Sequence, residues 1–235
     1  MSKNIGPPLS QSKVFLDSEG DHWFKRNKSA ISSKTFFYDT EIIKRVLASY
    51  KANINSVLEI GCGNGAKLEN ICSFFNATGS GVDPSSAAIK NGNERFVKQS
   101  NKNLKLEISI ASKLPYNDSS FDLVYLASCL HWVDRNEIFK VAAEADRVLK
   151  PGRFLVVFDF DPGQRHKRAY HHKLGLFTYK NSHSDFFTAG GHYYLVAKES
   201  VSHSTNHFST DINERMSVCI LYKEPDAYLC GEVIP

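Results

Sequence analysis

The sequence has 235 residues, enough for one folded domain with a sizeable core. Hydrophobic residues make up 42% and charged residues 23%, which is typical of a globular chain and excludes an extended disordered protein. The formal net charge of +4 is compatible with an anionic small-molecule partner. It disfavours a nucleic-acid partner, because the sequence has no dense stripe of Lys and Arg.

Targeting and redox signals are sparse. No stretch approaches ~18 consecutive apolar residues, so neither a membrane span nor a membrane partner is expected. The polar start of the chain lacks the apolar run of a signal peptide. The five cysteines form no C-x-x-C pair, so neither a disulfide framework nor a metal site is predicted. These features favour a cytoplasmic protein.

The chain divides into a predicted tail and a predicted domain. Residues 1–21 are predicted to be a disordered tail, and residues 22–235 a single domain. Within that domain, aromatic and basic residues alternate over residues 22–38, which are predicted to form an N-terminal lid. Asp39 is predicted to cap the next helix, because apolar residues follow it at helical spacing.

Strands and helices alternate from residue 56 onward. Ser85 is predicted to cap the second of these helices, and Asp134 with Glu137 to begin a later one in a capping box. This alternation predicts an α/β fold with a Rossmann-like, doubly wound, mostly parallel sheet, whose ligands bind at the carboxyl ends of the strands. The predicted strands cover 56–60, 79–82, 104–110, 121–127 and 153–160.

The pattern changes after residue 160. Strand-like segments at 193–197, 201–207 and 218–222 have no long helices between them, which predicts an antiparallel C-terminal extension of the sheet. Residues 161–192 are predicted to be an insertion that covers the substrate. This insertion holds the densest basic cluster, and we expect three of its residues to contact an anionic substrate, with a solvated loop as the alternative: Arg168, His171 and His172.

The strongest local signal is a strand that runs into a turn with three glycines, residues 57–65. Glycine is needed where backbone approaches a ligand closely, and the helix after the turn offers free N–H groups. Taken alone, the turn also fits a dinucleotide fingerprint, so an NAD-dependent oxidoreductase stays open. Glu59, however, would repel a pyrophosphate, whereas its carboxylate suits a ligand with an ammonium group.

Further segments follow the turn in a defined order. They are Gly81–Ser85, Ile110–Pro115 with Phe121-Asp122, Leu130-His131-Trp132, and Leu149-Lys150-Pro151-Gly152. With the glycine turn, they resemble the class I S-adenosylmethionine-dependent methyltransferases, specifically the type 11 small-molecule group. The resemblance covers roughly residues 40–160.

The resemblance implies S-adenosylmethionine as the cofactor. The glycine turn would wrap its methionine part, Asp83 would hold its ribose hydroxyls, and Arg26 would reach over from the lid to its carboxylate, with an exposed, solvated arginine as the alternative. The family's acidic residue for adenine falls on Ile110, so the backbone of the next two residues is expected to hold the base. The implied cofactor contacts are Arg26, Glu59, Gly61, Cys62, Gly63, Asn64, Gly65, Asp83, Pro84, Ala111, Ser112 and Ser128.

Two further residues are candidates for the chemistry. His131 lies just past the fourth strand and is suited to act as a general base, although a packing role is the alternative. Trp132 is expected to form a wall of the acceptor pocket or to stack on adenine. The predicted function is methyl transfer to oxygen or nitrogen of a polar small molecule, such as a sugar, a nucleotide-linked sugar or a phosphorylated metabolite. A carboxyl methyltransferase of a small acid and a non-catalytic cofactor-binding subunit remain as alternatives.

Overall fold

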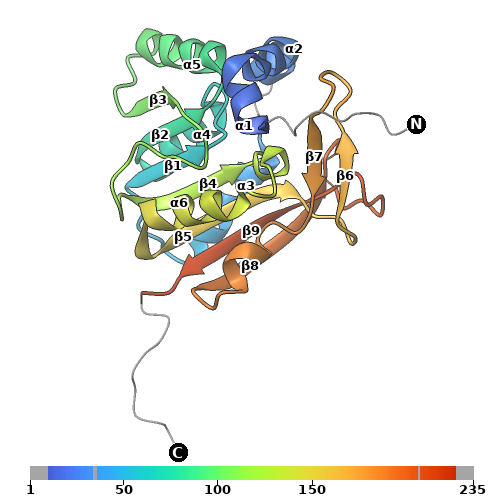
Figure 1. Cartoon of the computed structure of the whole chain (residues 1–235). Coiled ribbons are helices and arrows are strands. Elements are labelled where there is room, and N and C mark those ends of the chain that lie inside the picture. Colours follow the sequence, from blue (N-terminus) through green and yellow to red (C-terminus); the bar gives the residue numbers. More distant parts are fainter. Residues whose placement is uncertain (1–9, 34–35, 206, 226–235) are drawn as a thin grey trace, which may run out of the picture.

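The computed structural model describes residues 10–33, 36–205 and 207–225. Its centre is a sheet of seven strands in the order β3-β2-β1-β4-β5-β9-β8 (Figure 1). The first five strands in chain order run parallel, and β9 and β8 add antiparallel strands at one edge. The predicted fold class is confirmed. The bounds are β1 Ser56–Ile60, β2 Thr78–Asp83, β3 Leu104–Ile108, β4 Phe121–Ala127, β5 Leu149–Phe160, β8 Tyr193–Ser202 and β9 Arg215–Lys223.

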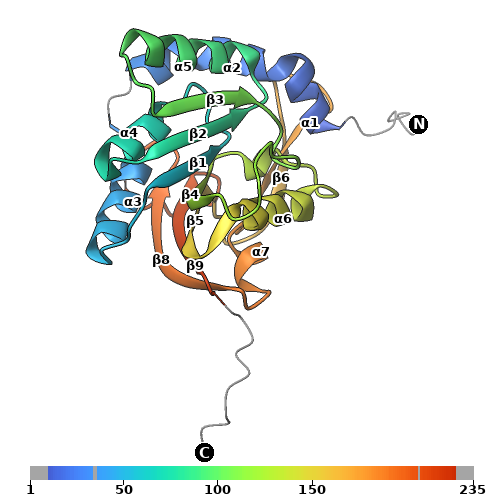
Figure 2. The same cartoon turned by 90° about the vertical axis from the view of Figure 1, so that its left-hand side faces the viewer.

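Helices cover both faces of the sheet (Figure 2). On one face lie α3 (Tyr38–Ser49), α4 (Ala66–Phe75) and α5 (Ser86–Lys98), and on the other α6 (Ile138–Val148) and α7 (Asp185–Thr188). The central strand β4 is buried along its whole length, as expected for a parallel strand covered on both faces. No helix in the described part of the chain is both long and apolar enough to span a membrane.

The strand order reverses between β1 and β4, which lie side by side. The glycine turn follows β1, and the short helix η2 (Leu130–Trp132) follows β4. Both segments therefore leave the sheet at the same edge, beside the topological switch point where open α/β sheets bind their ligands.

The structure corrects the predicted tail. Residues 10–21 are not disordered: they contain α1 (Gln11–Val14), the π-helical turn η1 (Phe15–Glu19) and the start of α2 (Gly20–Ser33). Gln11 explains why, because its side chain donates to the carbonyl of Trp132 (2.6 Å) and accepts from the amide of Phe177 (2.6 Å). Such distant partners leave no periodic signal in the sequence. Residues 1–9 lie outside the described residues.

Two of the three predicted helix caps also need correction. Ser85 does cap α5, since its hydroxyl accepts from the amide of Ala88. Asp39, in contrast, lies inside α3, where its buried carboxylate accepts from Tyr125 and pairs with Lys67.

Asp134 likewise makes no capping box with Glu137. Helix α6 begins at Ile138, and Asp134 accepts from the backbone amide of Gln11 (2.7 Å). The carboxylates of Asp39 and Asp134 were both predicted to cap a helix. In the structure, each of them instead binds a partner that is distant in sequence.

The C-terminal part differs in detail from the prediction. The segments predicted at 193–197 and 201–207 are largely one strand, β8, whose register shifts between Leu195 and Ala197. Within 161–192 a hairpin forms that the sequence did not predict, made of β6 (His166–Ala169) and β7 (Phe177–Lys180). In Figure 1 this hairpin lies beside α1 and α2, along the edge of the sheet where the glycine turn emerges.

Candidate active site

A cavity of about 600 Å³ lies at this edge. Its walls come from the glycine turn, the segments after β2, β3 and β4, the N-terminal helices, and the β6–β7 hairpin. Most of the predicted site residues line it: Glu59, Gly61, Cys62, Gly63, Asn64, Asp83, Pro84, Ala111, Ser112, Ser128, His131, Trp132, Arg168 and His171. A cavity of this size is typical of cofactor and small-molecule sites.

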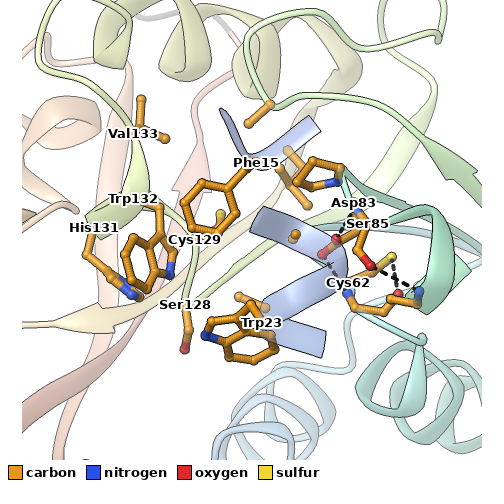
Figure 3. Close-up of a pocket in the computed structure, with 18 of the residues that line it drawn as sticks. Phe15, Trp23, Cys62, Asp83, Ser85, Ser128, Cys129, His131, Trp132 and Val133 are labelled. Atoms are coloured by element: carbon orange, nitrogen blue, oxygen red, sulfur yellow. Dashed lines mark hydrogen bonds between the residues drawn. The ribbon is translucent and has the colours of Figure 1, made fainter. Parts of the chain in front are cut away.

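Asp83 ties two backbone segments together at one side of the cavity (Figure 3). Its carboxylate accepts from the amide of Gly63 (2.9 Å) and from the amide of Ser85 (2.8 Å). Burial raises the pKa of Asp83 to about 6. At neutral pH the carboxylate is still mostly ionised, and its remaining lone pairs can accept hydrogen bonds from a pair of ligand hydroxyls.

The middle glycine of the turn faces open space. Gly63 has φ +54°, and a Cβ built there would meet nothing within 4 Å. Gly65 is different, because a Cβ there would lie 3.0 Å from Leu106 and Phe96. Gly65 is therefore a packing residue outside the cavity lining, whereas Gly63 leaves room for a ligand against the backbone.

A carboxyl group and an ammonium group, those of Glu59 and Lys67, lie beyond the glycine turn. Glu59 is 1% exposed, and its carboxylate accepts from the amide of Leu68 (2.9 Å). Burial raises the pKa of Glu59 to about 8. Lys67, which also lines the cavity, places its ammonium 2.6 Å from the buried carboxylate of Asp39. This end of the cavity offers an ammonium group and a carboxyl group that can ionise beside a bound cation, the pattern that an amino-acid zwitterion requires.

His131 is held by a buried carboxylate. Its Nδ1 lies 2.8 Å from Asp159, whose side chain is 2% exposed, and its backbone amide also donates to Asp159 (3.2 Å). Burial opposes ionisation of Asp159, but its electrostatic interaction and hydrogen bond with the His131 ring hold its pKa at about 2. The sequence did not single out Asp159, although an acidic residue at the carboxyl end of β5 was a usable signal.

Aromatic rings form the wall next to His131. The ring of Trp132 lies 5.0 Å from that of Phe15 and 4.8 Å from that of Tyr170, measured between centroids. Figure 3 shows Trp132 and His131 on the side of the cavity away from Asp83. Phe15 lies in η1, which belongs to the segment predicted to be a disordered tail, whereas Tyr170 lies in the insertion that was predicted to cover the substrate.

Arg26 and His172 are not among the residues that line the cavity. Arg26 donates to Glu19 (2.5 Å) and to the hydroxyl of Tyr170 (2.6 Å), and thus links α2 to the hairpin region. His172 packs against the ring of His171, with centroids 3.8 Å apart. In the described ranges, no group of three or more His, Cys, Asp and Glu side chains is arranged to hold a metal ion.

The fold and the cavity define a class I, Rossmann-like ligand-binding domain. Residues 57–152 match the family model described as "Methyltransferase domain". Over nearly the whole chain the structure is similar to the crystal structure of 1,6-didemethyltoxoflavin-N1-methyltransferase from Burkholderia thailandensis with bound S-adenosylhomocysteine. The TM-score is 0.72 at 13% identity, and the alignment covers 95% of this chain and 93% of that one.

Curated relatives match part of the chain. The sterol 4-C-methyltransferase of Caenorhabditis elegans is 32% identical over 124 residues, which are 49% of this chain and 36% of the relative. The 27-O-demethylrifamycin SV methyltransferase of Amycolatopsis mediterranei is 34% identical over 106 residues, 44% of this chain and 38% of the relative. The chain thus spans little more than a third of these relatives. Residues 57–152 therefore match a methyltransferase domain, and the chain has the fold of the class I S-adenosylmethionine-dependent methyltransferases, as the sequence predicted.

Replacing Asp83 with alanine is expected to weaken binding of S-adenosylhomocysteine by about 10–100-fold, because hydrogen bonds to a charged group contribute about 1.5–3 kcal/mol. Calorimetric titration checks this. If Asp83 accepts from ribose hydroxyls, the wild type should bind adenosine more tightly than dideoxyadenosine, and the variant should not distinguish them. Equal discrimination by both proteins would contradict the assignment.

Proposed function

We propose that the chain catalyses methyl transfer from S-adenosylmethionine to a hydroxyl oxygen or a nitrogen of a polar small molecule. The observation that carries the proposal is the contact between His131 and Asp159 in the wall of the cavity. A cofactor site alone would also suit a binding subunit, whereas an imidazole oriented by a buried carboxylate is a catalytic arrangement.

The state of the dyad follows from its charges. Asp159 is ionised at neutral pH, because its pKa is about 2, so its oxygens can only accept a hydrogen bond. His131 must therefore carry its proton on Nδ1 and donate it to Asp159. In the neutral imidazole, this tautomer leaves the lone pair on Nε2, which can remove a proton from an acceptor hydroxyl in the cavity.

The residues present fit the cofactor. Asp83 offers its carboxylate to the ribose, Gly63 gives close access to the backbone, and Glu59 and Lys67 provide charges for the ammonium and carboxylate of the methionine part. When bound, the cofactor supplies an activated methyl group on a sulfonium centre. The protein then needs to exclude water, align the acceptor and remove its proton.

Glu59 gives this proposal a pH signature. With a pKa of about 8, its carboxyl is largely protonated at neutral pH, and a bound ammonium would favour the ionised form. Binding of S-adenosylhomocysteine should therefore release a proton near neutral pH and strengthen as pH rises toward 8.

Calorimetry in buffers of different ionisation enthalpy measures this proton release. The observed enthalpy should depend on the buffer for the wild type, but not for Glu59→Gln. Adenosine, which has no ammonium group, serves as the matched ligand and should release no proton from Glu59. A buffer-independent enthalpy for wild-type protein with S-adenosylhomocysteine would contradict the role of Glu59.

The test of the function is a titration with S-adenosylhomocysteine, with NAD in parallel, followed by an acceptor screen. Binding of NAD alone would overturn the proposal, and binding without turnover of any acceptor would favour the non-catalytic subunit. The acceptors to screen first are sugars, nucleotide-linked sugars and phosphorylated metabolites, with small carboxylic acids as the alternative class.

The four described cysteines are unpaired, which supports the expected cytoplasmic location.

A further inference from the structure

A buried lysine lies in the cavity wall next to the dyad. Lys180, the last residue of β7, is 4% exposed and lines the cavity. Its ammonium donates to the carbonyl of Asn213 (2.7 Å) and lies 3.8 Å from the centroid of the Phe160 ring. The same ring lies 5.1 Å from that of His131. Lys180 and His131 thus contact one aromatic side chain and are within reach of one bound molecule.

The partners of Lys180 leave its charge uncompensated. Among the described residues, no carboxylate oxygen lies within the 4.0 Å that defines an ion pair with its ammonium. Asp159, Asp211 and Glu214 act on it only as more distant charges, and burial lowers the pKa of Lys180. Buried charges in proteins are normally paired, and an ammonium can donate three hydrogen bonds. A carbonyl and a ring face are weak substitutes for a counter-ion.

The hairpin presents further donors on the same face. In its antiparallel register, Arg168 pairs with Thr178 and His166 with Lys180. Directly opposite residues and residues two apart share a face, so all four belong to one side of the hairpin. Arg168, Thr178 and Lys180 line the cavity. The Nε2 of His166 is buried and has no hydrogen-bond partner among the described residues.

We propose that this face of the β6–β7 hairpin, with Lys180 at its centre, binds an oxyanion of the methyl acceptor. The inference rests on the proposed function and narrows its substrate class: the acceptor carries a carboxylate or a phosphate beside the group that His131 deprotonates. The anion supplies the counter-charge that Lys180 lacks, and the aromatic wall formed by Trp132 and Phe160 packs against the rest of the molecule.

Calorimetry with protein saturated by S-adenosylhomocysteine tests this. The probes are inorganic phosphate and two matched pairs: ribose phosphate with ribose, and hydroxybenzoate with hydroxybenzyl alcohol. Binding of an anionic probe, with its neutral counterpart at least about tenfold weaker, is expected, because one charge-assisted hydrogen bond contributes about 1.5–3 kcal/mol. The pair that responds identifies the oxyanion as a phosphate or a carboxylate.

Lys180→Met keeps the length of the side chain and removes its charge. It should weaken binding of the anionic probe by about tenfold or more and leave binding of S-adenosylhomocysteine unchanged. Lys167→Met is the matched control, because Lys167 lies on the opposite face of the same hairpin and is exposed. Inorganic phosphate should also raise the melting temperature of the wild type more than that of Lys180→Met.

Three outcomes would overturn the inference: no anionic probe binds the wild type, neutral counterparts bind equally well, or Lys180→Met binds the anion as the wild type does. Affinity for S-adenosylhomocysteine is measured first in each protein. Its absence in the wild type would overturn the proposed function, whereas normal cofactor binding with no response to anions would overturn this inference alone.

Discussion

Replacing His131 with alanine is expected to lower turnover by about 10²–10⁴-fold, which is the usual contribution of a positioned general base. The dissociation constant of S-adenosylhomocysteine should stay close to that of the wild type, because His131 lies on the side of the cavity away from Asp83 (Figure 3). The measurement is the formation of S-adenosylhomocysteine with the acceptor that the screen identifies. Added imidazole should restore part of the rate.

Asp159→Asn tests the same mechanism through the tautomer. An asparagine can present its NH₂ group to Nδ1 of His131, which then favours the proton on Nε2 and blocks proton removal. Turnover should fall while affinity for S-adenosylhomocysteine remains. Imidazole should rescue His131→Ala but not Asp159→Asn, since in the latter the cavity is still filled by the histidine ring.

His22→Ala is the control for loss of a histidine, because the His22 side chain is 59% exposed on α2. A near-normal rate for His131→Ala would contradict the general-base role. It would favour the carboxyl acceptor instead, because a carboxylate is already deprotonated at neutral pH. The two acceptor classes are thus distinguished by one variant.

The central part of the fold was predictable because its signals are local. Residues 56–60 and 121–127 form strands with the predicted bounds, since parallel strands covered on both faces are continuous apolar runs. The glycine turn and Asp83 are likewise adjacent in sequence to the strands that position them. These features form the side of the cavity that we propose binds the cofactor.

The side of the cavity that we propose binds the acceptor was less predictable, because long-range contacts build it. Gln11 and Phe177 are 166 residues apart, yet their hydrogen bond joins the N-terminal helix to the hairpin. Polar residues at the start of the chain were predicted to be disordered because their partners are not neighbours in sequence. Arg26 was expected at the cofactor, but Glu19, seven residues away, offers a buried partner for its charge.

The dyad shows the same limit within the site. His131 was a candidate from its position after the fourth strand, but Asp159 lies 28 residues further on, at the end of the next strand. The sheet brings the two together, because β4 and β5 are neighbours. Sequence spacing alone gave no reason to choose Asp159 over Asp161, whose carboxylate pairs with Lys198.

Replacing Gly63 with valine is expected to weaken binding of S-adenosylhomocysteine by more than about 100-fold. The side chain would project into the space against which the ligand is expected to lie, because a Cβ at Gly63 meets no protein atom within 4 Å. Calorimetric titration measures the loss. The backbone cost is separate: a left-handed conformation costs a residue with a Cβ about 1–2 kcal/mol.

Gly191→Val separates these two effects. Gly191 has φ +74°, compared with +54° for Gly63, and a Cβ there also meets nothing within 4 Å. It is not among the residues that line the cavity. Both variants should therefore lose similar stability in thermal unfolding, and only Gly63→Val should lose the ligand. If both bind normally, the glycine turn does not contact the cofactor; if both lose binding, backbone strain rather than the blocked cavity is responsible.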